Sequence, residues 1–164
     1  MKTKELTRIA FMAAILVCVF QMFAQILYLE MITFTIVVFS CNFSRKEAVM
    51  ACLIFGMVNM LFMGITPWTL MYVLIYPCYA WIVSLHKLAW WQNHPLMLYL
   101  LCGFLSFLTG QLLDLPFLLF SGKITIIYIL MGIKTSVIQG ILSFLACMFL
   151  FDPVTKRLQL LLKE

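Results

Sequence analysis

The sequence predicts an all-α membrane protein with six transmembrane helices and both termini in the cytoplasm. Hydrophobic residues make up 65% of the 164 residues and charged residues only 10%, which is too little charge to cover a soluble domain. The apolar runs are long and lack the alternation of barrel strands, so helices are favoured as the structures that satisfy backbone groups in lipid. We expect one integral membrane domain over residues 1–164.

Short polar or turn-forming stretches divide the chain into six apolar segments. The expected helices cover residues 6–27, 30–42, 45–63, 67–86, 95–120 and 124–151. A helix needs roughly 20 residues to cross a bilayer, and the second segment has only about 11 apolar residues. Whether this segment spans the membrane fully stays open.

Local signals define several helix ends. Ser44 is a candidate N-cap for the third helix, and Glu47 three residues later would complete a capping box. Pro67 suits the first turn of the fourth helix. Residues 121–123 break the fifth run, and Asp152-Pro153 is expected to end the sixth.

The basic residues favour an even number of spans. With six helices and both termini inside, the Lys and Arg residues of the termini and loops fall on the cytoplasmic side, except Lys123. This distribution follows the positive-inside rule. The net charge of +5 then reflects topology and contact with anionic lipid, so no nucleic-acid partner is expected.

Sequence signatures of enzymes and of resident metals or cofactors are missing. The chain has no H-E-x-x-H, G-x-S-x-G or P-loop motif. Its two histidines, His86 and His94, fall in one loop, and its six cysteines form no C-x-x-C pair. We expect a protein that is not an enzyme, holds no metal or cofactor, and cannot use ATP by itself.

Polar residues inside apolar segments are costly in lipid and are candidates for function. They are Gln21 and Gln25, Asn59, Gln111 and Asp114, and Lys134 and Gln139. Gln111 and Asp114 are three residues apart and share a helix face. Lys134 is about 15 Å into its helix. It either pairs with Asp114 or snorkels to an interface, or it contacts a ligand in a polar cavity.

The fourth helix carries an aromatic stripe on one face, and small residues mark other helix faces. The stripe is Trp68, Tyr72, Tyr76 and Tyr79. It indicates either an interfacial belt or rings that stack on a flat ligand. Small residues recur every fourth position at Ala10 and Ala14, at Ser106 and Gly110, and at Gly132, Ser136 and Gly140. Packing within the chain is the expected use of the last two sets.

Taken together, these features resemble the substrate-binding S component of an energy-coupling factor (ECF) vitamin transporter. The resemblance covers nearly the whole chain. It includes the opening stretch 6–14, the turn 43–47 and the stretch 64–68 before the fourth helix. It implies a prokaryotic plasma-membrane protein that works with a transmembrane coupling subunit and two cytoplasmic ATPases. In this family the S component topples in the membrane to release its vitamin inside.

The resemblance also implies roles for particular residues. Ala10 and Ala14 would dock on the coupling subunit. The residues near the ligand cavity would be Gln25, Glu30, Asn59, Trp68, Tyr72, Gln111, Asp114 and Lys134. The family's cavity lies near the outer surface, between the first and third outer loops and the outer ends of the fourth to sixth helices.

The ligand is open at this stage. Motifs associated with riboflavin, thiamin, biotin or folate are missing, which disfavours these ligands but does not exclude them. The remaining candidates include cobalamin and pyrimidine- or pyridoxine-type precursors. Cobalamin is weakly preferred, because short outer loops and few polar groups suit a large corrinoid held shallowly. Two other classes also stay open. The chain could be a self-sufficient small secondary transporter or channel, or a membrane assembly subunit without a ligand.

Overall fold

A computed structural model describes residues 3–23, 26, 28–119 and 121–163 of the protein. Throughout these ranges the regular structure is helical. The elements in chain order are α1 (Thr3–Phe23), α2 (Ile32–Asn42), α3 (Arg45–Met63), α4 (Pro67–Val83), α5 (Leu88–Asn93), α6 (Pro95–Leu112), the 3₁₀ helix η1 (Leu115–Leu119) and α7 (Gly122–Lys163). The all-α prediction is therefore confirmed for the part of the chain that the structure describes.

Four helical stretches are long and apolar enough to cross a membrane. They are Thr3–Phe23, Arg45–Met63, Pro95–Leu119 and Thr125–Leu161. The helices Ile32–Asn42 and Pro67–Val83 are apolar but shorter. This pattern of length and composition is consistent with a protein embedded in a membrane.

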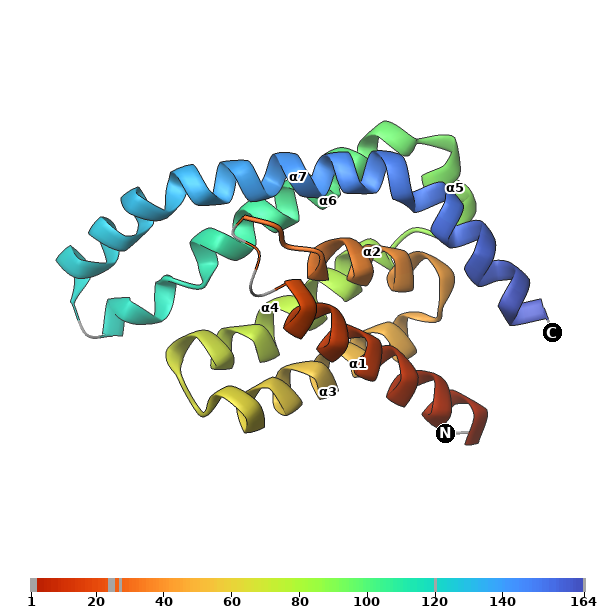
Figure 1. Cartoon of the computed structure of the whole chain (residues 1–164), viewed down its shortest axis with the longest axis horizontal. Helices are drawn as coiled ribbons and strands as arrows, with labels where there is room; N and C mark the ends of the chain where they lie inside the picture. The colour runs from red at the N-terminus through yellow and green to blue at the C-terminus, as the bar shows by residue number, and fades with distance from the viewer. Residues whose placement is uncertain (1–2, 24–25, 27, 120, 164) are drawn as a thin grey trace.

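The helices form two groups with α2 between them (Figure 1). α6 and α7 pack against each other as a long hairpin, while α3 and α4 form a second hairpin that α1 covers. α2 contacts members of both groups, and nine of its 11 residues are buried. A helix this short is stable here because other helices, rather than lipid, surround most of its side chains.

The hairpin of α6 and α7 depends on glycines at its contact. A Cβ atom on Gly103 would lie 2.8 Å from the carbonyl oxygen of Gly140, and one on Gly140 would lie 2.9 Å from that of Gly103. A Cβ on Gly110 would collide with Ser136 Oγ. The small residues of α6 and α7 therefore serve packing within the chain, as the sequence predicted.

Polar contacts gather at the end of the molecule where both α1 begins and α7 ends (Figure 1). Ser44 caps α3 through the predicted capping box, because its Oγ accepts from Glu47 N at 3.3 Å and Glu47 Oε2 accepts from Ser44 N at 3.1 Å. Glu47 also pairs with Arg8 of α1 at 3.7 Å. Arg45 donates to the Ser84 carbonyl oxygen near the end of α4 at 3.2 Å. These contacts join α1, α3 and α4 at one end.

The three largest departures from the predicted helices are at the end of α7, in the loop before α6 and at the end of α6. α7 runs through Pro153 to Lys163 instead of ending at 151. Its last turns remain packed, because Phe151 and Thr155 are buried and Asn42 Nδ2 donates to Thr155 Oγ1 at 3.3 Å. The predicted loop 86–95 contains α5. Trp91 of α5 donates from Nε1 to the Val83 carbonyl oxygen at 3.1 Å, and this bond holds α5 against the end of α4.

The third difference is in the fifth predicted segment. There α6 ends at Leu112 and the chain continues as η1, which contains Pro116. Proline cannot donate the backbone hydrogen bond that an α-helix requires, which accounts for the change to a 3₁₀ helix. Pro67 begins α4 as predicted, next to the N-cap Thr66, whose side chain accepts from Thr69 N.

Candidate functional site

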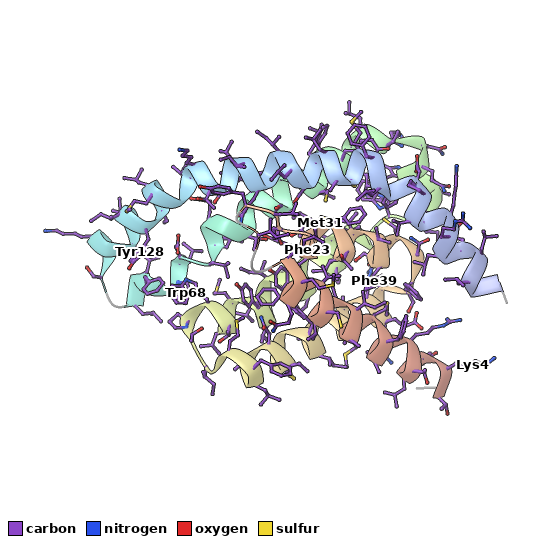
Figure 2. All side chains as sticks on the ribbon, viewed as in Figure 1. Lys4, Phe23, Met31, Phe39, Trp68 and Tyr128 are labelled. Carbon is purple, nitrogen blue, oxygen red and sulfur yellow. The ribbon has the colours of Figure 1, made fainter. Side chains whose placement is uncertain are left out.

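A cavity of about 450 Å³ is lined by residues from both groups of helices and from the connection between α1 and α2. Phe23, at the end of α1, and Met31, just before α2, lie close together in the middle of the molecule (Figure 2). Both line the cavity, so the connection between α1 and α2 forms part of its wall. Its other lining residues are Phe20, Ile26, Tyr28, Leu29, Glu30, Ile32, Tyr72, Tyr76, Thr109, Gly110, Leu113, Gly132, Thr135, Ser136 and Gln139.

One wall of the cavity is aromatic. The rings of Tyr72 and Tyr76 stack with centroids 5.3 Å apart and planes 17° apart. Phe20 meets Tyr72 edge to face at 5.8 Å, and Phe55 lies behind Tyr76 at 5.6 Å. Tyr76 is fully buried. Two of the four residues of the aromatic stripe on α4 thus face a cavity inside the protein and are not an interfacial belt.

Glu30 brings a carboxylate to the cavity. Thr33 donates to Glu30 Oε1 from its backbone nitrogen at 3.3 Å and from its Oγ1 at 2.7 Å. Ser106 Oγ of α6 donates to Glu30 Oε2. Ser143 Oγ of α7 donates to the Glu30 carbonyl oxygen at 3.0 Å. The side chain and backbone of Glu30 are therefore held by three helices.

The local sequence explains why Glu30 reaches this position. Tyr28 has a positive φ of 68°, which turns the chain between α1 and α2. Glu30 then precedes α2 and accepts from one of the backbone N–H groups that have no partner within the helix. A carboxylate at a helix N-terminus also interacts favourably with the helix dipole.

The carboxylate has hydrogen bonds, but no cation among the described residues pairs with it. In the described part of the chain, the ion pair within 4.0 Å joins Arg8 to Glu47. Neither of these residues lines the cavity. Desolvation by burial raises the pKa of Glu30, and the hydrogen bonds from Ser106 and Thr33 oppose that rise. No Lys, Arg or His stands among the described cavity residues, so the cavity offers negative charge without positive charge.

A second polar cluster adjoins the cavity at α7. Gln111 Nε2 donates to Ser136 Oγ at 2.7 Å. Asp114 Oδ2 lies 3.4 Å from where a Cβ on Gly132 would be, and Trp68 is a hydrogen-bond donor to Asp114. Because Gly132 and Ser136 also line the cavity, the structure brings the predicted residues Trp68, Gln111 and Asp114 to its edge.

Lys134 lies on the other side of α7. It is two residues from both Gly132 and Ser136, or about 200° around the helix, and its side chain is exposed. It forms no ion pair within 4.0 Å among the described residues. The expected pairing with Asp114 is therefore not observed there, and snorkelling is the interpretation that this position favours.

Two other predicted cavity residues do not join the site. Asn59 is buried in α3, and its Nδ2 has no hydrogen-bond partner within the described part of the chain. It is not among the residues that line the cavity. Gln25 lies outside the described residues.

The predicted docking residues Ala10 and Ala14 are on the exposed face of α1. The opposite face buries Ile9, Met12 and Leu16. Phe11, beside Ala10, is 67% exposed. This face of α1 is consequently not used for packing within the described chain.

Several residues that line the cavity or bond to Glu30 are not predicted as site residues from the sequence. In the sequence, Ser106 fits the pattern of a small packing residue. Thr109 and Thr135 give no sign of a site, because hydroxyl groups commonly bond to their own helix. Gln139 is polar within a predicted span, and its spacing of three residues from Ser136 places both on one face of that helix.

No protein-family model matches the chain, and no curated protein or solved structure matches it either.

Proposed function

We propose that the protein is the substrate-binding S component of an ECF-type vitamin importer in a prokaryotic plasma membrane. It captures a small vitamin or precursor in the cavity and delivers it inward with a separate ATP-driven module. The observation that carries the proposal is the cavity itself. It is about 450 Å³ in volume, is walled by aromatic rings and a few polar groups, and lies in an otherwise apolar helical chain.

The proposed orientation places the chain termini in the cytoplasm and the cavity toward the outside. It is supported by the basic residues at the termini and at the turn between α2 and α3. With α2 and α4 as short spans the chain has six, and the cavity opens where a ligand would arrive from outside. The partners are a transmembrane coupling subunit, two cytoplasmic ATPases and membrane lipid. Enzymatic activity would then belong to the ATPases.

The volume of the cavity favours a compact ligand. Stacked tyrosines suit a flat ring, and about 450 Å³ is small for a corrinoid held inside the protein. Of the two candidates named from the sequence, a pyrimidine- or pyridoxine-type precursor therefore fits this cavity better than cobalamin. Cobalamin would have to bind largely outside it.

The test is ligand binding by the purified chain in detergent, measured by calorimetry with B vitamins and their precursors. Tight binding of one compound, lost on Tyr72→Ala and kept in Lys134→Met, would support capture in this cavity. Transport of that compound by the chain alone in liposomes, driven by a proton or sodium gradient, would instead establish a secondary transporter. Stable association with partners but no ligand would indicate an assembly subunit.

A further inference from the structure

We infer that the cavity selects a compact aromatic heterocycle that carries a positive charge, with Glu30 as its countercharge and the Tyr72–Tyr76 stack as its wall. This inference rests on the proposed function and specifies the ligand class of the same site. It depends on three observations. They are the missing cation beside Glu30, the hydrogen-bonding capacity left on its carboxylate, and the aromatic surface next to it.

The missing cation is the first observation. An ionised carboxylate within an apolar protein is costly unless it is paired, and in membrane proteins such groups mark ligand or ion sites. Glu47, a buried glutamate of α3, has both a capping role and a cation, Arg8 at 3.7 Å. Glu30 has a capping role through Thr33 but no cation among the described residues. A ligand in the cavity could supply that cation.

The second observation is that the Glu30 carboxylate can accept a further hydrogen bond. An ionised carboxylate has about four sites that accept hydrogen bonds. The described residues fill three of them, two from Thr33 and one from Ser106. A helix cap alone would need only the Thr33 contacts, so capping does not account for the carboxylate's position at the cavity and its bond to α6. One more charged N–H donor would complete the set.

The aromatic wall is the third observation. Glu30, Tyr72 and Tyr76 all line the same cavity. A ring that stacks on these tyrosines would therefore lie near the carboxylate. Tyrosine faces attract cations, and the attraction grows when water is excluded. The wall and the carboxylate thus favour the same ligand, a flat cation.

The charge of the cavity disfavours anionic ligands. No Lys, Arg or His is among its described lining residues, so a ligand carboxylate would find no ionic partner. It would also be repelled by Glu30, because like charges in a low dielectric interact strongly. Acidic vitamins are therefore expected to bind poorly.

The experiment uses three compounds with one ring and different charges. Pyridoxamine carries a protonated aminomethyl group at pH 7, pyridoxine is neutral, and 4-pyridoxate is an anion. Thiamin is included as a permanent cation with a second ring. Affinities for the full chain in detergent are measured by calorimetry. We expect at least one cation to bind more tightly than pyridoxine, and 4-pyridoxate to bind most weakly.

Glu30→Gln should weaken binding of the cation by about 10- to 100-fold, the usual effect of losing a charge-assisted hydrogen bond. It should change pyridoxine binding little. Glu47→Gln is the matched control, because it removes a buried carboxylate at the other end of the helices and Gln can still cap α3. Binding by Glu47→Gln should equal that of the wild type.

The outcomes separate the inference from the function on which it rests. If pyridoxine or 4-pyridoxate binds best, or if Glu30→Gln binds the cation as well as the wild type, the inference is overturned while capture of a ligand stands. If no compound in the wider panel of B vitamins and precursors binds, the capture function itself is overturned. The wild-type order of affinities needs no variant, so the inference remains testable if Glu30→Gln does not fold.

Discussion

Ser106 on α6 donates a hydrogen bond to Glu30 in the connection between α1 and α2. The two residues are 76 positions apart in the chain, and their bond joins the α6–α7 hairpin to the cavity wall next to α2. Ser143 of α7 adds to the same junction, with its Oγ 2.9 Å from Ser106 Oγ. A ligand at Glu30 would therefore influence the contact between the two groups of helices as well as its own site.

Ser106→Ala tests the importance of this junction for stability. The substitution leaves Glu30 Oε2 without its donor in a partly buried place, so we expect a loss of about 1–2 kcal/mol. The measurement is thermal unfolding of the purified chain in detergent. Thr7→Ala is a matched control, because its hydroxyl donates to its own helix on an exposed face and should matter by no more than about 0.5 kcal/mol. Equal melting temperatures for both variants would contradict the structural importance of the bond.

Gly103→Ala tests the close contact of α6 with α7. A new Cβ would meet the carbonyl oxygen of Gly140 at 2.8 Å, and backbone atoms cannot move aside as a side chain can. We expect a loss of about 1–3 kcal/mol from overpacking, measured as a lower melting temperature. Gly122→Ala is the control, because no atom of the described residues outside its own local chain lies within 4 Å of its Cβ position and alanine favours a helix. A neutral Gly103→Ala variant would show that the hairpin is looser than described.

The sequence predicted most of the fold because the physical signals were local. Apolar length located the helices, and Ser44 with Glu47 and Pro67 correctly predicted two helix starts. The end of α7 was not predictable in this way. Asp152-Pro153 is a local signal for a helix end, but burial of Thr155 and its bond to Asn42 depend on tertiary packing.

The candidate site was predictable only in part, for the same reason. The spacing of Tyr72 and Tyr76 placed them on one face, and that face does line the cavity. The spacing of Gln111 and Asp114 likewise predicted one shared face, and both side chains lie against α7. The contact of Glu30 with Ser106 depends on a turn at Tyr28 and on the helices coming together. The side of α7 that Lys134 occupies depends on how α7 packs against α6, which spacing alone does not determine.

The exposed face of α1 leads to a prediction about partners. Ala14→Trp should block assembly with the proposed coupling subunit, because a large ring on a small-residue face prevents close helix contact. Ligand binding should be unchanged, since Ala14 is exposed and outside the cavity. The measurement is co-purification with the coupling subunit and ATPases. Leu61→Trp is the control, at a position on α3 that is 85% exposed. Normal assembly of Ala14→Trp, or equal loss in both variants, would exclude this face as the docking surface.

Glu30 also predicts opposite effects of pH on the empty and the liganded protein. Burial raises its pKa above the ordinary 4.5. A group whose pKa is raised on folding stabilises the fold most at low pH, and this contribution is lost as the pH rises through the folded-state pKa. The other titratable groups that face Glu30 are Tyr72, Tyr76, Tyr79 and Cys102, and they stay neutral below pH 7. The melting temperature of the empty chain should therefore rise as the pH falls from 7 toward 5.

Binding of a cation such as pyridoxamine should change in the other direction. Protons compete with the ligand for Glu30, so affinity should fall over the same range in which the empty protein becomes more stable. The ligand's own aminomethyl group remains protonated throughout, as amines of this type have a pKa near 10, and it does not contribute to the change. In Glu30→Gln the pH dependence of ligand affinity should disappear. Its persistence in that variant would show that a different group titrates, and would remove Glu30 as the countercharge of the site.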